Sequence, residues 1–545
     1  MEIFQPKQMN SWKYGVVFFP AGIALWLIFL ICSSPRLPSG DISCFKDSGI
    51  NFAQGRGLVE IATPSNPTLV PKFYSNYPPL FPFLYGIYSS QAGVSDQADE
   101  IFSFIISGLA TVLFWFFVTN QFTARQGSRP GLFLLALLLM MLPVGPLWTQ
   151  RERPDLLGFI FIMISLWPLR NGLTLQRVCL SAFLAGIGCL ISPFSFFINM
   201  VAIGCLILVE IGQFDLPNYP RLKKAILLVA AVLGGLALPL ASLFLIQWLN
   251  DPQAPARFIA NAMGKTTGGQ AGTGYFASML AGDFKRHLTA FSRFDSLRYK
   301  WMLLHLLFTA PLASFLLFRS YLNKGGGHSC WQAFTPLLLA LVPLIVFPYQ
   351  PCYMSLTAST ILILFSILAS KEKFPQSVAN QWVPVISIGF LSLVAVPFMF
   401  REFVAAFQAR ETYHEAHAMI RRIRSDPKRQ IHLIASKDTF YFLFKQAGFE
   451  VVEVDYLKDS SDIAKVDLFA FHAVEHDGHS PSEFPAWWKP ENMEVVHLPR
   501  LSSELKIFNS SIPKINLLGI NIYSPSAATW EPALYRFKSK GPVDD

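Results

Sequence analysis

The sequence is poor in charged residues. Only 14% of its 545 residues are charged and 52% are hydrophobic, whereas soluble globular proteins carry about 25% charged residues. Because so few ionic groups cannot keep a surface of this size in water, an ordinary soluble enzyme is excluded. The formal net charge is +9. We interpret this basic excess as a signal for membrane orientation, since Lys and Arg accumulate in short cytoplasmic loops, and we expect no nucleic-acid partner.

Three further absences narrow the function. The seven cysteines show no spacing typical of a metal site, so no metal site is predicted. No Gly-rich phosphate loop follows a predicted strand, and the stretch Gly264–Gly274 has Gly, Lys and Thr in the wrong order for one. No internal repeat of the kind found in transporters is evident. A soluble nucleotide substrate is therefore not expected.

Long apolar runs are what the chain has in abundance. A run of about 18 or more residues can cross a hydrocarbon core about 30 Å thick. The stretch 178–209 is too long for one span and short for two, and Pro193 interrupts it, so we predict a hairpin of two short helices. The sequence then predicts an all-α polytopic membrane bundle of about eleven spans. The runs lie at 14–32, 101–119, 131–148, 155–169, 178–209, 225–249, 301–318, 331–349, 353–370 and 381–400.

The basic residues predict the orientation of this bundle. With the hairpin, the loops richest in Lys and Arg all fall on one side, which is cytoplasmic by the positive-inside rule. Without the hairpin, every later loop would change sides, and its Lys and Arg residues would fall on the outer face. We therefore expect a multi-pass protein of the plasma (inner) membrane, with a cytoplasmic N-terminus and a C-terminal domain on the outer face. The inside residues are Arg125, Arg129, Arg170, Arg177, Arg221, Lys223, Lys224, Arg319, Lys324, Lys371 and Lys373.

The chain divides into three predicted parts. Residues 1–13 form a cytoplasmic tail, and residues 14–400 form the membrane part, which contains two long outer loops, 33–99 (the first loop) and 250–300 (the second loop). Residues 401–545 form a helical connector and a soluble domain. Short apolar strands alternate there with a helical pattern, which predicts a small α/β domain. The strands are expected at 431–435, 451–454 and 467–471.

The first loop contains the most distinctive motifs. Asp41 lies just past the first span, and apolar residues at helical spacing follow until Gly55 and Gly57 end the helix. The segment 77–82 (YPPLFP) is a rigid turn before an aromatic stretch suited to the membrane interface. A second charged cluster, 151–155 (RERPD), lies in the next outer turn. Because charges are costly inside a bilayer, both clusters mark a water boundary on the same face.

These motifs resemble those of the GT-C glycosyltransferases, which include the protein O-mannosyltransferases and the lipid A aminoarabinose transferases. The resemblance rests on the acidic residue after the first span, the helix closed by Gly-x-Gly and the Tyr-Pro-Pro-x-x-Pro turn, and it covers the whole topology. It implies a polyprenyl-phosphate-linked sugar as donor and a first-loop carboxylate as base. Ser192-Pro193 and Cys352-Tyr353 depart from the family, because the basic residues often found there are missing, so other cations must contact the phosphate.

The expected reaction moves a sugar from the lipid phosphate to a hydroxyl of a glycan, lipid or protein acceptor, with inversion, in contact with membrane lipid. A carboxylate would assist loss of the hydroxyl proton, and cations would meet the charge that develops on the phosphate. Whether a divalent cation (Mg²⁺ or Mn²⁺) takes part is left open by the sequence. The candidates are Asp41, Glu152 and Asp155 for catalysis, Arg56, Arg151, Arg153, Lys265 and Arg298 for donor-phosphate binding, and Asp47, Tyr77 and Tyr353 for the substrate cavity.

Two other functions are left open by the sequence. A transporter or flippase for a lipid or polyol would need ionisable groups or broken helices near mid-membrane, and His305 is the main candidate of that kind. A non-catalytic assembly subunit would keep the topology without the activity. The glycine-rich stretch 264–274 fits either a mobile lid or a plain connector.

Overall fold

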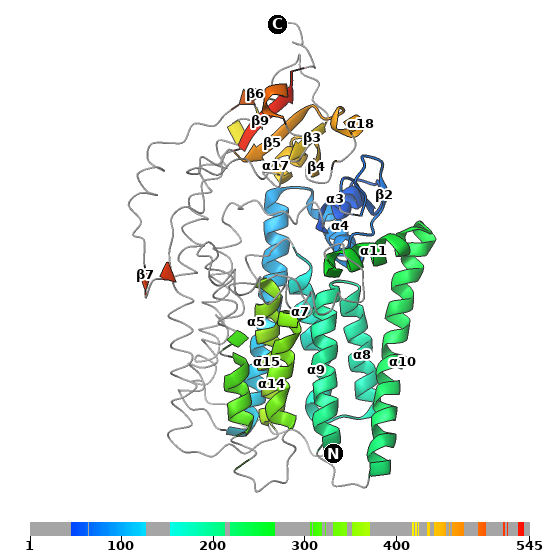
Figure 1. The fold of residues 1–545 in the computed structure, drawn as a ribbon, viewed down its shortest axis with the longest axis vertical. Coiled ribbons are helices and arrows are strands. Elements are labelled where there is room, and N and C mark those ends of the chain that lie inside the picture. Colours follow the sequence, from blue (N-terminus) through cyan, green and yellow to red (C-terminus); the bar gives the residue numbers. More distant parts are fainter. Residues whose placement is uncertain are drawn as a thin grey trace.

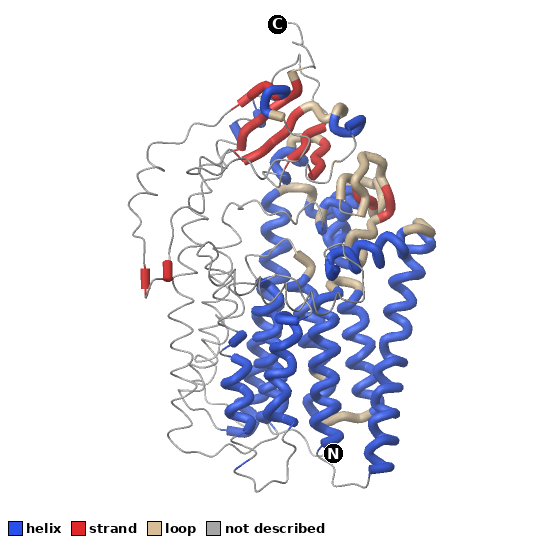
Figure 2. The backbone as a smooth tube through the Cα atoms, viewed as in Figure 1, coloured by secondary structure: helices blue, strands red, loops and turns tan. Residues whose placement is uncertain are grey.

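The computed structural model describes 45–126, 153–212, 218–267, 306–318, 331–345 and 351–370, with single gaps at 64 and 308, and parts of the region from 417 to 538. The predicted tail 1–13 and the predicted spans 14–32, 131–148 and 381–400 lie outside the described residues. The long helices stand side by side, and most of the strands gather beyond one end of them (Figures 1 and 2). We call this end of the bundle the sheet-bearing end.

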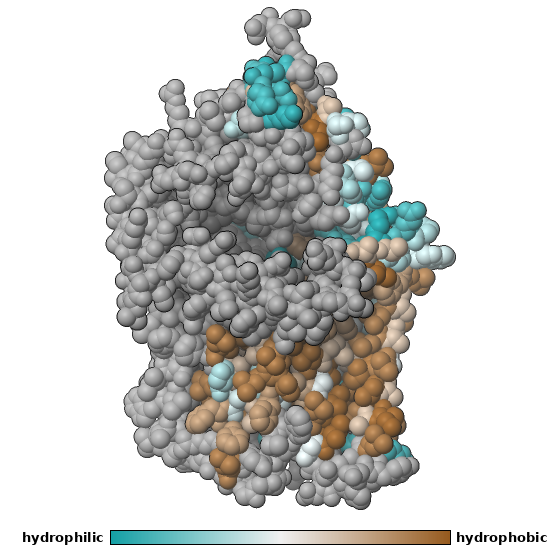
Figure 3. Space-filling view, in the orientation of Figure 1, coloured by the Kyte–Doolittle hydropathy of each residue, from teal (hydrophilic) through white to brown (hydrophobic). Residues whose placement is uncertain are grey.

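Apolar helices form the bundle. Among the described residues, three helices are long and apolar enough to cross a membrane, namely Gln97–Phe114, Pro193–Gly212 and Leu222–Asn250. Their outward faces carry apolar side chains, and Figure 3 shows these as a hydrophobic surface over the lower part of the molecule. Because such a surface is stable only against lipid, the chain is an integral membrane protein. The long helices are α5 (Asp96–Gln126), α7 (Asp155–Leu166), α8 (Leu175–Cys189), α9 (Pro193–Gly212), α10 (Asn218–Asn250), α14 (Trp331–Ile345) and α15 (Pro351–Ser370).

The predicted helical hairpin is confirmed. Helix α8 ends at Cys189, and α9 begins at Pro193 after only three residues. Proline is favoured at the first position of a helix, since its missing N–H has no partner to lose there. The turn lies at the sheet-bearing end, where the Leu190 carbonyl oxygen accepts a hydrogen bond of 3.0 Å from the Leu80 backbone N–H. The hairpin apex is thereby joined to the first loop.

Small residues bring the helices close together. A Cβ atom built on Gly186 of α8 would lie 2.8 Å from the Cβ of Pro239 in α10, and one built on Gly235 of α10 would lie 2.9 Å from the Cβ of Ala182. Interfaces between membrane helices are enriched in such residues, because they let backbones approach closely. Helices α8 and α10 accordingly pack along much of their length.

The first loop forms a small folded layer at the sheet-bearing end (Figure 1). Helix α3 (Asp47–Ala53) is followed by Gly55 and Gly57 at φ values of 78° and 81°, so the predicted end of this helix is confirmed. Positive φ favours glycine because it has no Cβ. The first loop also contains β1 (Val59–Glu60), β2 (Lys72–Phe73) and α4 (Leu80–Ala92). The second loop begins with α11 (Ala254–Thr267).

A five-stranded sheet forms the described core of the C-terminal region. Its order is β4-β3-β5-β9-β6, in which β3 pairs in parallel with β4 and β5, whereas β9 is antiparallel to β5 and β6. The three predicted strands are present as β3, β4 and β5. The elements are β3 (Leu433–Ser436), α17 (Tyr441–Gln446), β4 (Glu450–Glu453), α18 (Ser460–Ile463), β5 (Leu468–His472), β6 (Met493–His497) and β9 (Pro532–Phe537), with the separate pair β7 (Asn516–Leu517) and β8 (Ile520–Asn521).

Candidate functional site

A buried arginine lies where three segments meet at the sheet-bearing end. Arg153, just before α7, is only 7% exposed. Its Nε donates to Oδ2 of Asp155 at 2.9 Å, and its Nη2 donates to the hydroxyl of Tyr353 at 2.9 Å. Tyr353 is in the first turn of α15 and is fully buried. The guanidinium thus joins the start of α7 to the start of α15.

Asp155 holds this arginine in place. Its second oxygen, Oδ1, accepts a hydrogen bond of 2.6 Å from the hydroxyl of Ser192 at the hairpin apex, and its side chain is 2% exposed. Gly158, one turn further along α7, lets the first turn of α9 approach, since a Cβ there would lie 2.6 Å from the Cβ of Ser195. Both carboxylate oxygens therefore accept hydrogen bonds from groups that the helices hold in fixed positions.

Aromatic rings surround the guanidinium. The Arg153 Cζ lies 5.4 Å from the ring centroid of Phe45 and 5.8 Å from that of Tyr353. The Phe45 and Tyr77 centroids are 4.6 Å apart, and those of Phe194 and Tyr353 are 4.5 Å apart. Ring faces attract a cation, and more strongly where water is excluded. We call Arg153, Asp155, Ser192, Tyr353 and Phe45 the Arg153 cluster.

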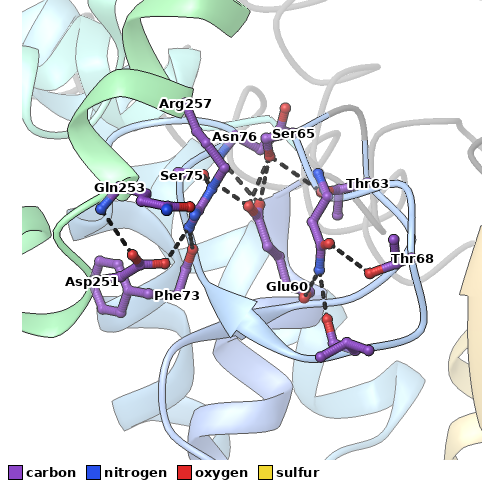
Figure 4. A network of polar contacts seen from close by, with 12 residues as sticks. Glu60, Thr63, Ser65, Thr68, Phe73, Ser75, Asn76, Asp251, Gln253 and Arg257 are labelled. Carbon is purple, nitrogen blue, oxygen red and sulfur yellow. Dashed lines mark hydrogen bonds and ion pairs between the residues drawn. The ribbon is translucent and has the colours of Figure 1, made fainter.

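A second polar centre lies in the first loop around Glu60 (Figure 4). Its fully buried carboxylate accepts from the Ser65 hydroxyl at 2.8 Å to each oxygen, from the Ser75 hydroxyl at 2.9 Å and from the Asn76 backbone N–H at 3.2 Å. Burial raises the pKa of Glu60, although these hydrogen bonds act in the opposite direction. We call Glu60, Ser65, Ser75 and Asn76 the Glu60 cluster.

Helix α11 is fastened to the Glu60 cluster. Arg257 donates from Nη2 to Oδ2 of Asp251 at 2.6 Å and from Nε to the Ser75 hydroxyl at 3.2 Å (Figure 4). Asn261 donates to the backbone carbonyl of Asn76 at 2.7 Å. Burial would raise the pKa of Asp251, but hydrogen bonding to Arg257 holds it below its ordinary value. The base of the second loop is therefore fixed to the first loop.

The predicted site residues fall into three groups. Arg153, Asp155 and Tyr353 are brought together as described, and the Tyr77 ring meets the Phe45 ring edge to face beside them. Asp47 and Arg56 instead contact the C-terminal region, Asp47 through Lys445 and Arg56 through Glu450. Lys265 lies in α11, which also includes the first residues of the glycine-rich stretch 264–274. Outside the described residues, or without a described side chain, are Asp41, Arg151, Glu152, Lys265, Arg298 and His305.

Sequence reasoning does not reveal three features of the site: the role of Ser192, the polar centre around Glu60 and the contact of Phe45 with Arg153. Ser192 was interpreted as a departure from the family, yet its hydroxyl fixes Asp155. Its position before Pro193, at the apex of a hairpin on the same face as residues 151–155, was a usable signal. Glu60 had no signal of that kind, because its partners meet only when the loop folds. Phe45 is one of the apolar residues at helical spacing after Asp41, but the sequence does not predict its contact with Arg153.

Comparison with known proteins gives distant structural similarities. No protein-family model and no curated protein matches the chain. It is similar to ArnT from Cupriavidus metallidurans bound to undecaprenyl phosphate (12% identity, 96% of this chain and 98% of that one, TM-score 0.49). It is also similar to the oligosaccharyltransferase AglB from Archaeoglobus fulgidus in complex with an inhibitory peptide and a dolichol-phosphate (11% identity, 85% and 69%, 0.47).

A third similarity is to the arabinofuranosyltransferase AftD from Mycobacteria, with 11% identity and a TM-score of 0.42. It covers 97% of this chain and 40% of AftD. All three similarities are at 12% sequence identity or less.

Proposed function

We propose that this protein is a membrane glycosyltransferase that moves a sugar from a polyprenyl-phosphate carrier to an acceptor hydroxyl at the outer face, with inversion. The observation that carries the proposal is the buried, preorganised guanidinium of Arg153 at the end of the apolar helices. Its donors are oriented by Asp155 and Tyr353. A lipid phosphate has its tail in the bilayer and its charged group at the bilayer surface, which suits a buried cation at the end of apolar helices.

Stability alone does not account for this cation. Replacing a buried ion pair by well-packed apolar residues is often neutral or stabilising, and the surroundings of Arg153 are largely aromatic. A fixed cation in a site that excludes water instead stabilises charge that develops on a leaving group, without reorganisation at the moment of reaction. The leaving group of the proposed reaction is a phosphate, which fits this role.

The acceptor side of the reaction needs a base. Asp41 is four residues before Phe45, and four residues span at most about 14 Å. Phe45 contacts Arg153, so we propose Asp41, which is close to Phe45 in the sequence, as this base. Its carboxylate would take the acceptor proton while the acceptor oxygen bonds to the anomeric carbon. The bond from that carbon to the phosphate oxygen breaks at the same time, and polyprenyl phosphate leaves.

A transfer assay tests the reaction. Purified protein in nanodiscs is mixed with polyprenyl-phosphate sugars labelled in the sugar, and with membranes that contain unmodified acceptor. We expect label in the acceptor and an equal amount of released polyprenyl phosphate. Asp41→Asn should lower the rate by about 10²–10⁴-fold while its gel-filtration profile stays unchanged. A normal rate in this variant would exclude Asp41 as the base.

Movement of the intact lipid-linked sugar across the bilayer, without release of polyprenyl phosphate, would contradict the proposal and identify a flippase. An inert but well-folded wild type, tested with a broad set of sugar donors, would also contradict it and favour the assembly-subunit hypothesis.

Carrier binding tests the role of Arg153 separately. Arg153→Gln should weaken binding of polyprenyl phosphate at least about tenfold, a loss of roughly 1.4 kcal/mol. The matched control is Arg170→Gln, because Arg170 stacks on Trp167 just past the other end of α7. This control should bind the carrier normally. Equal affinities of Arg153→Gln and the wild type, measured in the same nanodiscs, would remove Arg153 from the phosphate site.

A further inference from the structure

The first loop and the C-terminal sheet share one hydrophobic core. Ala62 is fully buried there, and Ile61 and Leu69 pack against the same cluster as Val452 of β4 and Phe469 of β5. This contact joins segments that are far apart in the sequence. The C-terminal region is therefore packed directly onto the loop that leads into the Arg153 cluster.

Hydrogen bonding continues this contact. The backbone N–H of Leu69 donates to Oδ2 of Asp462 in α18 at 3.1 Å. Asp462 is itself buried and also pairs with Lys465. The loop backbone is thus held in a fixed register against the sheet, because a hydrogen bond to a buried carboxylate has a defined direction and length.

Four charged residues form a chain across the same boundary. Lys445 of α17 lies 3.3 Å from Oδ1 of Asp47 and 2.9 Å from Oε1 of Glu450, and Arg56 lies 2.7 Å from Oε2 of Glu450. Burial would raise the pKa of Glu450, but Lys445 and Arg56 hold it below its ordinary value. The Lys445 side chain is 1% exposed and pairs with both carboxylates.

Helix α3 connects this chain of charges to the Arg153 cluster. Asp47, its first residue, contacts Lys445 on one side, and Phe45, two residues earlier, stacks over Arg153 on the other. The fully buried pair of Lys46 and Asp99, 2.7 Å apart, ties the same turn to α5. A helix of seven residues is not stable alone, so its position is set by these contacts.

We infer that Lys445 is a positioning residue: the C-terminal domain holds α3 through Asp47 and thereby sets Phe45 against Arg153. This inference rests on the proposed function. Lys445 does not contact the reacting groups in this arrangement. Its loss should therefore lower the rate of transfer and leave carrier binding intact, whereas loss of Arg153 should weaken carrier binding itself.

The test compares three variants of the full-length protein. Lys445→Met removes the charge and keeps an unbranched side chain, and Lys445→Arg restores the charge. Arg536→Met is the matched control, because it breaks an ion pair of 2.8 Å with Glu494 between β9 and β6, in the same domain and away from α3. The readouts are hydrogen exchange of the peptide 45–53, kcat and KM for transfer, and affinity for polyprenyl phosphate.

We expect Lys445→Met to exchange faster over 45–53, since local opening needs less free energy once a buried contact is lost. Its kcat should fall about 10–100-fold, as expected when reacting groups are displaced by about 1 Å, with carrier affinity unchanged. Lys445→Arg should recover most of the rate, and Arg536→Met should match the wild type in all three readouts.

Two results would overturn the inference and leave the proposed function standing: unchanged exchange over 45–53 in Lys445→Met, or a normal kcat in a variant whose α3 exchanges faster. An inactive wild type would defeat the proposed function instead. Should Lys445→Met fail to fold, Glu450→Gln takes its place, because it removes one of the two carboxylates that fix Lys445. It should raise exchange over 45–53 to a smaller extent, and unchanged exchange in that variant would overturn the inference.

Discussion

The Arg153 cluster and the Glu60 cluster lie at the same end of the molecule and bury a charged group in different ways. The partners of Arg153 and Asp155 come from the start of α7, the hairpin apex and the first turn of α15. The partners of Glu60 are two hydroxyls and a backbone N–H within sixteen residues of it. The partners of Arg153 and Asp155 come together only when the helices assemble, whereas Glu60 finds its direct partners within its own loop.

This difference separates a carboxylate that organises a loop from an ion pair that we propose takes part in the chemistry. Glu60 organises a loop, since its hydrogen bonds replace water around one negative charge. Arg153 and Asp155 form a buried ion pair, and such pairs are weak evidence for stability. The Arg153 cluster is therefore the stronger candidate for chemistry, and the Glu60 cluster is the frame that supports the first loop.

The largest expected effect comes from Asp155→Asn. Removing one partner of a buried ion pair leaves the other charge uncompensated, which costs about 3–5 kcal/mol. We expect a lower free energy of unfolding by that amount, measured by thermal unfolding in detergent, together with weaker binding of polyprenyl phosphate because Arg153 loses its orientation. Arg536→Met, which breaks a partly exposed pair with Glu494, is the control. A change below about 1 kcal/mol in Asp155→Asn would remove the contrast with the Glu60 cluster.

A smaller effect is expected from Gly158→Ala. The new Cβ would lie 2.6 Å from the Cβ of Ser195 and 3.1 Å from that of Ser192, so the first turn of α9 must move away from α7. Overpacking of this kind costs about 1–3 kcal/mol, and it should also weaken carrier binding, because Ser192 moves away from Asp155. Gly204→Ala in α9 is the matched control, since a Cβ there meets nothing within 4 Å. Equal stability of the two variants would show that α7 and α9 do not need this close approach.

Local features of the chain were predictable from its sequence. Pro193 inside a long apolar run predicted the hairpin of α8 and α9, because proline has strong positional preferences in helices. Gly55 and Gly57 predicted the end of α3 for a similar reason, since their φ values suit glycine alone. Strands β3, β4 and β5 followed from short apolar runs. Each of these signals depends on neighbours in the sequence.

Contacts between distant segments were not predictable in the same way. The hydrogen bond from Ser192 to Asp155 depends on how deeply α9 packs against α7, and the pair of Lys445 and Asp47 depends on where the sheet rests on the first loop. The sequence by itself gives neither the packing of α9 against α7 nor the position of the sheet on the first loop. The motifs 151–155 and 77–82 were placed on the same face by counting spans, but their exact partners required the packed structure.

The smallest effect is expected from Glu60→Gln. An amide keeps one acceptor for the Asn76 N–H, and the hydroxyls of Ser65 and Ser75 can rotate to accept from its NH₂ group, so the free energy of unfolding at neutral pH should change by less than about 1 kcal/mol. The pH dependence is the sharper readout. Burial raises the pKa of Glu60 above its ordinary value of 4.5. Between pH 4.5 and this raised pKa, the folded wild type therefore keeps a proton on Glu60 that the unfolded chain has lost.

Wild-type stability should therefore decrease as pH rises from 4.5 through the raised pKa of Glu60, and this decrease should be smaller in Glu60→Gln, which has no proton to lose. Thermal unfolding of both proteins between pH 4.5 and 8 measures the difference, and Glu494→Gln, at an exposed carboxylate in β6, is the control. Parallel pH profiles for Glu60→Gln and the wild type would mean that Glu60 titrates normally. The two clusters would then differ only in where their partners come from, and not in what burial does to the charge.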